Sequence, residues 1–122
     1  MFKQGDVVLG AFATPDGTVL NHYSVVLDSN SEGVMLVYTT SLKEHSQCSQ
    51  RFSAEDMMLA AWTKPCRYDA SQVCVVPATQ VRKTGRITQA TFKAIRNAFT
   101  QALRSRNVKS ALLKPTGEVV CA

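Results

Sequence analysis

Four short apolar runs rich in β-branched residues, followed by one amphipathic stretch, most constrain what this chain can fold into. The runs cover residues 7–9, 23–27, 34–38 and 73–76, and the amphipathic stretch covers about Thr88 to Arg106. Each run is bounded by Gly, Asp, Asn or Pro, which is typical of buried strands. The order predicts a mainly β fold with one C-terminal α-helix, in the form of a small β-barrel closed by that late helix.

The turn residues predict that the first three strands form an antiparallel meander. Thr14 to Gly17 has Pro at the second position and Gly at the fourth, which suits a type I turn. Asp28 to Gly33 is typical of a polar hairpin loop. The third strand is then expected to end at Thr39–Ser41.

The helix has a clear predicted start. Thr88 is a good N-cap, and Ile87 can pack on Phe92 as a hydrophobic staple. The apolar side chains then repeat at intervals of three and four residues. Residues 79–86 are expected to form a basic connector into this helix, and the tail from Asn107 is expected to add a small hairpin.

Residues 42–70 are the least informative segment, and no role is assigned to them as a whole. A polar loop is expected from Lys43 to Gln50, and Ser53 can cap a short helix. Trp62 can begin an edge strand and pack into the core, or it can stack on a nucleic-acid base. Core packing is the more common role of such a residue.

The length of 122 residues and the hydrophobic content of 45% predict one folded domain over residues 1–122. The apolar runs are too short for a membrane helix, which needs roughly 20 residues. The N-terminal segment lacks the apolar core of a signal peptide. We therefore expect a soluble, cytoplasmic protein.

Charge is distributed unevenly along the chain. Residues 1–69 contain five Lys or Arg and eight Asp or Glu, whereas residues 70–122 contain nine Lys or Arg and only Glu118. This asymmetry favours a polyanion or an acidic peptide as partner. A basic helix that only keeps the protein in solution is the alternative.

The cysteines do not form a metal-binding or disulfide pattern. Cys48, Cys66, Cys74 and Cys121 contain no CxxC pair and match no standard zinc spacing. Cys74 lies inside a predicted strand and is expected in the core. We expect no metal ion and no cofactor.

The ordered set of segments resembles the MazF/PemK-like toxins of toxin–antitoxin systems. Gly5 to Leu9 is similar to the family's opening strand, Tyr23 to Leu27 to its second strand, and Val34 to Ser41 to its third strand. Residues 71–82, followed by Gly85 to Thr88, are similar to its penultimate strand and the entry to its helix. The resemblance implies an SH3-like barrel, a homodimer and metal-independent cleavage of RNA.

One departure from the family pattern affects the implied site. The family's catalytic arginine stands at the start of the second strand, where this chain has His22 and Tyr23. The family's catalytic threonine corresponds to Thr40, with Thr39 as the alternative register. The resemblance therefore carries over the threonine but not the arginine.

The resemblance implies a catalytic role for His22 and Thr40. Histidine suits proton transfer near neutral pH, so His22 can replace the arginine in acid–base work, while Thr40 can donate a hydrogen bond to phosphate. Residues expected to bind the RNA are Thr39, Arg82, Lys83 and Arg86. The implied partners are single-stranded RNA and an antitoxin protein of acidic character.

Two alternatives remain open at this point. A histidine at a strand edge is often structural, and a chain that lacks the family arginine can be a non-catalytic binding module for nucleic acid or for an acidic protein. A structural or regulatory dimer whose basic helix docks an acidic partner is the third possibility.

Overall fold

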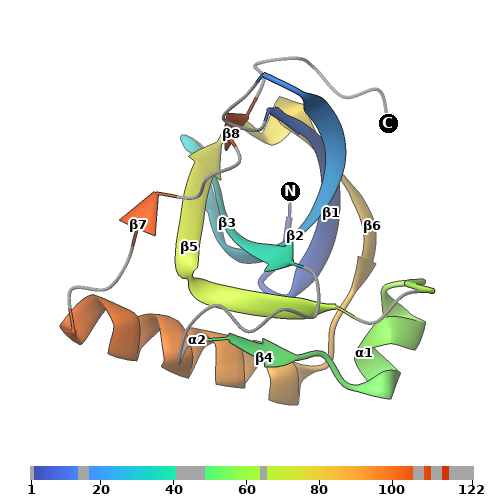
Figure 1. Ribbon diagram of the computed structural model, residues 1–122, viewed down its shortest axis with the longest axis vertical. Coiled ribbons are helices and arrows are strands. Elements are labelled where there is room, and N and C mark those ends of the chain that lie inside the picture. The colour runs from blue at the N-terminus through green and yellow to red at the C-terminus, as the bar shows by residue number, and fades with distance from the viewer. Residues whose placement is uncertain are drawn as a thin grey trace.

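One strongly curled, mostly antiparallel sheet makes up most of the molecule (Figure 1). The computed structural model describes residues 2–13, 17–40, 49–63, 66–105, 109–110 and 114–115. Its principal strands are β1 (Asp6–Ala13), β2 (Val19–Asn30), β3 (Gly33–Thr40), β4 (Ser49–Arg51), β5 (Arg67–Val76) and β6 (Val81–Arg86). They follow the order β4-β5-β3-β2-β1-β6. The predicted meander of the first three strands is confirmed.

The sheet is curled but not closed. Strands β4 and β6 lie at the two ends of the path, and within the described parts of the chain they do not pair with each other. The fold is therefore mainly β with a C-terminal helix, as predicted, whereas the closed barrel is not observed. The hairpin expected in the tail from Asn107 falls mostly outside the described residues, and the two described pieces of the tail each join the sheet. Strand β7 (Lys109–Ser110) pairs with β5, and β8 (Lys114–Pro115) pairs with β1.

The prediction of a connector at residues 79–86 is wrong. A 3-10 turn, η1 (Ala78–Gln80), leads into β6, which pairs with β1 along its length. Of the residues in β6 only Val81 is buried, because this strand lies at the end of the sheet path. An edge strand with polar residues on both sides lacks the apolar alternation by which strands are predicted.

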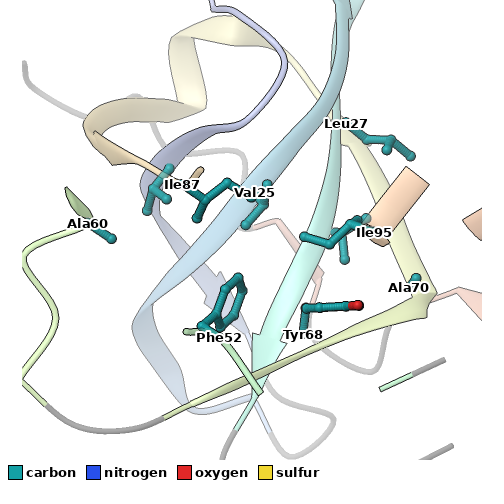
Figure 2. Close-up of a cluster of buried hydrophobic side chains, with 10 residues drawn as sticks. Val25, Leu27, Phe52, Ala60, Tyr68, Ala70, Ile87 and Ile95 are labelled. Atoms are coloured by element: carbon teal, nitrogen blue, oxygen red, sulfur yellow. The ribbon is translucent and has the colours of Figure 1, made fainter. Parts of the chain in front are cut away.

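Two buried clusters cover opposite faces of the sheet, because successive residues of a strand point to opposite sides. The inner cluster lies within the curl, and the outer cluster lies between the sheet and the helices, where Figure 2 shows most of its members. The inner cluster consists of Val8, Phe12, Val26, Val34, Leu36, Tyr38, Val76 and Val81. The outer cluster consists of Val7, Val25, Leu27, Val37, Phe52, Ala60, Tyr68, Ala70, Ile87 and Ile95.

The side chains of Asn30 and Asp69 accept backbone hydrogen bonds where the sheet turns or bends. Asn30 Oδ1 accepts hydrogen bonds from the amides of Glu32 (2.8 Å) and Gly33 (3.1 Å), so the loop predicted at Asp28–Gly33 shortens and both strands extend into it. The predicted turn at Thr14–Gly17 lies mostly outside the described residues. At the bend of β5, Asp69 Oδ1 accepts from the amide (3.0 Å) and hydroxyl (2.6 Å) of Ser71.

The long helix α2 (Gln89–Arg104) covers the outer face of the sheet beside β5 and β4 (Figure 1). The Thr88 hydroxyl caps it by accepting from the Thr91 amide at 3.2 Å, as predicted. Ile95 and Ala102 are buried, and Phe92 and Phe99 pack against the outer cluster. Within the described residues no helix is long and apolar enough to cross a membrane.

A buried carboxylate joins the start of α2 to the short helix α1 (Ala54–Leu59). Asp56 is fully buried, and its Oδ2 accepts from the amide (3.0 Å) and hydroxyl (2.8 Å) of Ser53, the predicted cap of α1. Its Oδ1 accepts from the Thr88 amide at 2.8 Å, and Oδ2 also accepts from the Thr91 hydroxyl. One side chain therefore satisfies polar groups at both helix starts.

The hydrogen bonds to Asp56 lower the pKa of its carboxyl group. Burial alone would raise the pKa of the carboxyl, but hydrogen bonds from Thr91, Thr88 and Ser53 outweigh burial and hold it below its ordinary value. The ionised form is therefore the one that the fold stabilises.

We predict that Asp56→Asn lowers the free energy of unfolding by about 1–3 kcal/mol at pH 7, because the amide offers donors where the hydroxyls of Ser53 and Thr91 need an acceptor. Since the folded pKa is lowered, the ionised carboxylate stabilises fully above the unfolded pKa of about 3.9. That contribution is lost as the pH falls through the folded pKa. Urea denaturation at several pH values measures it.

The matched control is Glu55→Gln, which changes an exposed carboxylate in the same helical turn. Its effect on the free energy of unfolding should be within about 0.5 kcal/mol. Equal effects of the two substitutions would contradict the role given to Asp56.

Candidate functional site

The start of β2 and the end of β3 lie side by side and carry the two residues predicted to be catalytic. Ser24 pairs with Tyr38, so two residues further along this register His22 reaches the level of Thr40. The His22 Nε2 atom lies 2.7 Å from the Thr39 carbonyl oxygen. The structure thus brings the backbones of these predicted residues together.

The hydrogen bond to Thr39 determines the tautomer of His22. A carbonyl oxygen only accepts hydrogen bonds, so Nε2 must carry the proton that it donates. In the neutral ring, Nδ1 is then left as the proton acceptor. This is the arrangement that a histidine base requires.

The surroundings of His22 favour its neutral form. The ring lies on the inner face of the sheet, in edge-on contact with Phe12 (6.2 Å between centroids) and Tyr38 (5.6 Å). Burial lowers the pKa of His22, although the hydrogen bond to the Thr39 carbonyl partly opposes this shift. The imidazole is therefore neutral at pH 7 and can accept a proton.

Thr39 has a structural role that its hydrogen bond defines. Thr39 is buried, and its hydroxyl donates to the Tyr23 carbonyl oxygen at 2.8 Å, which ties the strands together. The backbone of Thr40 lies at the end of β3 and pairs with that of Arg67 in β5. Thr39 is thus committed to holding β3 against β2.

Two arginines that sequence reasoning missed continue the row of His22 and Thr40. Arg67 in β5 pairs with Thr40 on one side and with Arg51 of β4 on the other. Residues 51 and 67 belong to the segment 42–70, which contains the weakest sequence signals of secondary structure. No spacing rule predicts a cross-strand pair that a helix and a loop separate along the chain.

The three basic residues predicted to bind RNA all lie on β6, but they do not converge on His22. Val81 and His22 both pair with Gly10, so Arg82, the next residue, points to the opposite face. Lys83 forms an ion pair with the buried Asp6 at 3.2 Å. Arg86 pairs with Asp6 at the other end of the strand. These residues form a basic edge, separate from the His22 row.

Trp62 packs into the outer cluster. Its ring makes edge-on contacts with Phe52 (4.9 Å between centroids) and with the partly exposed Tyr23 (5.8 Å). Core packing is therefore the role that the structure supports, and the edge strand is formed by residues 49–51 instead. Cys74 also packs against the inner cluster, as predicted. No group of three potential metal ligands occurs among the residues that the structure describes.

Comparison by sequence finds no matching family model and no matching curated protein. Comparison of structures finds clear neighbours. One is an endoribonuclease in complex with its cognate antitoxin from a Mycobacterial species, with a TM-score of 0.64 and 14% identity, covering 85% of this chain and 96% of that one. Another is the Mycobacterium tuberculosis toxin MazF-mt6, with a TM-score of 0.57 and 13% identity, covering 79% and 95%.

The chain has the fold of the MazF toxins. The resemblance drawn from the order of sequence segments is confirmed at this level, and the MazF-like fold spans most of the chain. At such low identity the likeness concerns the fold, so the site must be judged on its own residues. The difference at His22 lies at the start of β2, within this shared fold.

The environment of His22 predicts a pH-dependent stability. Because its folded pKa is lowered, the unfolded chain binds more protons below the unfolded pKa of about 6.5, and the protein loses stability as the pH falls through that value. In His22→Gln this loss should disappear, since the amide can still donate to the Thr39 carbonyl but does not titrate.

Thermal unfolding of both proteins between pH 5 and pH 8 measures the difference. His45→Gln, at the only other histidine of the sequence, is the matched control. If the melting temperatures of the wild type and of His22→Gln changed with pH in the same way, His22 would not be held in its neutral form.

Proposed function

We propose that this protein is a toxin-like endoribonuclease that cleaves single-stranded RNA without a metal ion. The observation that carries the proposal is a neutral histidine fixed at the paired ends of β2 and β3 within the MazF-like fold. Both structural neighbours are toxins or endoribonucleases by description. The basic C-terminal half of the chain suits a polyanionic substrate.

The chemistry that fits these residues is attack by a ribose 2′-hydroxyl on the adjacent phosphate. His22 Nδ1 takes the 2′-hydroxyl proton, the O2′–P bond forms and the P–O5′ bond breaks. The products are a 2′,3′-cyclic phosphate and a 5′-hydroxyl, and the imidazolium formed is a source of the proton for the departing oxygen. The bonds formed and broken and the proton transferred therefore balance without any further reactant.

Thr40 is proposed as the donor that stabilises charge on the phosphate, and the basic edge formed by Arg82, Lys83 and Arg86 is proposed to bind the RNA backbone. Thr39 contributes through its carbonyl, which orients His22. These assignments place proton transfer at the strand ends and backbone binding along β6.

We further propose that the protein acts in the cytoplasm as a homodimer and is inhibited by an acidic antitoxin. One neighbour was solved with its cognate antitoxin. An acidic, partly disordered tail would complement the basic β6 and α2 surfaces and would fold on binding. Such binding should weaken as the salt concentration rises.

A non-catalytic binding module is the second candidate, and one observation favours it. His22 packs against two aromatic rings and bonds a backbone carbonyl, which a purely structural histidine would also do. In that case the protein would bind RNA or an acidic partner and would cut neither.

We predict that the purified protein cleaves a long unstructured RNA in EDTA. His22→Ala and Thr40→Ala should each lower the cleavage rate by about 10²-fold or more, because general base catalysis and phosphate stabilisation contribute on that scale. Gel analysis of end-labelled RNA measures the rates. The matched controls are His45→Ala and Thr100→Ala, the latter at an exposed hydroxyl on α2.

Intact RNA after incubation with wild-type protein, together with retained binding, would favour the binding module. Cleavage that survives both His22→Ala and Thr40→Ala would contradict the proposed site but leave the activity.

A further inference from the structure

An aromatic ring is exposed on the outer face of the sheet, one residue after His22. Tyr23 is 36% exposed, although it lies within strand β2. Val25 belongs to the outer cluster, so Tyr23, two residues earlier, points to the same face. The helices therefore leave this part of the outer face uncovered.

Tyr23 belongs to a larger exposed surface on β6, β1 and the first half of β2. Leu9 pairs with Tyr23 on one side and with Arg82 on the other, so these three side chains form one cross-strand row. We call this surface the Tyr23 patch. By strand alternation it consists of Leu9, Ala11, Val19, Asn21, Tyr23 and Arg82. None of these residues carries a carboxylate.

The Tyr23 ring is held in place before any ligand binds. Trp62 contacts it edge-on at 5.8 Å between centroids, and Trp62 in turn contacts the buried Phe52 at 4.9 Å. An edge-on contact with Trp62 leaves at least one face of the tyrosine ring open. A ring that is already oriented loses little conformational freedom when a ligand binds.

Charge and position favour a nucleotide as the occupant of the Tyr23 patch. Arg82 is exposed, and within the parts of the chain that the structure describes it forms no ion pair. Neighbouring strands lie about 4.8 Å apart, so the backbone of Arg82 is about 10 Å from that of Tyr23. The long arginine side chain can span this distance toward a nucleotide on the ring. Proteins that bind single-stranded RNA on a sheet combine aromatic rings for the bases with basic groups for the backbone.

We propose that Tyr23 stacks on one base of a single-stranded RNA, and that Arg82 binds a phosphate beside that base. This inference rests on the proposed function for the identity of the ligand. His22 and Tyr23 are consecutive residues whose side chains lie on opposite faces of β2. An RNA strand that crosses the start of β2 can therefore contact both. Tyr23 is a binding residue that helps to position the RNA at His22.

The first test measures binding without cleavage. A fluorescent 2′-O-methyl oligoribonucleotide cannot react, so its affinity reports contacts alone. Tyr23→Val keeps a residue that favours strands but removes the ring, and it should weaken binding about tenfold. The slope of log K against log salt concentration should not change, because no charge is lost. Arg82→Ala should lower that slope by about 0.7, the value for one contact to a single strand.

An abasic scan identifies stacking directly. The oligonucleotide is made in versions that each lack one base, and the wild type should lose about tenfold in affinity at one position. Tyr23→Val should lose less than twofold there, since it has no ring to stack, whereas Tyr23→Phe should behave like the wild type. A wild-type scan in which no position stands out overturns the proposal without any variant.

Controls separate stacking from folding. Val75→Ala changes a side chain that is 60% exposed on β5, and its effect on the affinity should be less than twofold. Trp62 is the only tryptophan of the sequence, so its emission spectrum shows whether Tyr23→Val keeps the packing around it. If Tyr23→Val is as sensitive as the wild type to the missing base, Tyr23 has only a structural role and the proposal is overturned.

The second test separates this inference from the proposed function. If the wild type cleaves ordinary RNA but Tyr23→Val binds and cleaves like Val75→Ala, the stacking site is refuted and the nuclease stands. If the wild type shows the Tyr23-dependent abasic position but cleaves no RNA, the nuclease is refuted and the stacking site stands. If Tyr23→Val changes only the oligomeric state in analytical ultracentrifugation, the Tyr23 patch is an interface between copies of the chain and the proposal is overturned.

Discussion

The buried carboxylate of Asp56 is the interaction on which the arrangement of helices and sheet depends. It accepts hydrogen bonds from Ser53 at the start of α1 and from Thr88 and Thr91 at the start of α2. These bonds fix where both helices begin, and Gly85 of β6 permits the close approach of α1. A Cβ at Gly85 would lie 2.7 Å from the Leu59 carbonyl oxygen. The helices thereby cover much of the outer face of the sheet, while His22 lies on the inner face against Phe12 and Tyr38 of the inner cluster.

Strand alternation then determines what each face can do. On β2, His22 points to the inner face and Tyr23 to the outer face, where it meets Trp62. On β6, Arg82 is separated from the His22 row by the same rule. The fold therefore divides the predicted site residues into strand ends suited to proton transfer and an edge suited to electrostatic attraction of RNA. Lys83 pairs with Val8 of the inner cluster but forms an ion pair with Asp6, whereas Arg67 lies on the cross-strand row of His22 and Thr40.

Much of the fold was predictable because its signals are local. The runs in β1, β2, β3 and β5, the Thr88 cap of α2 and the Ser53 cap of α1 each depend on adjacent residues, and the structure confirms them. Strand β6 was missed because an edge strand with one buried residue has no apolar alternation. The prediction of a closed barrel was wrong because closure depends on pairing between the edge strands, which no local sequence pattern predicts.

The candidate site was predictable only in part. The position of His22 and Thr40 followed from the order of segments, but the inward orientation of the imidazole and its bond to the Thr39 carbonyl depend on the register of β2 against β3. Arg51 and Arg67 become neighbours only through the pairing of β4 with β5. Such a contact between residues far apart in the sequence depends on strand pairing, so the spacing of residues along the chain does not predict it.

The measurement that tests the account most directly is the chemical identity of the RNA ends produced by the purified wild-type protein in EDTA. A neutral histidine acting on the 2′-hydroxyl must leave a 2′,3′-cyclic phosphate and a 5′-hydroxyl, so the downstream fragment should accept labelled phosphate from polynucleotide kinase without prior dephosphorylation. Fragments with 5′-phosphate ends, or RNA that stays intact while the protein binds it, would contradict the account.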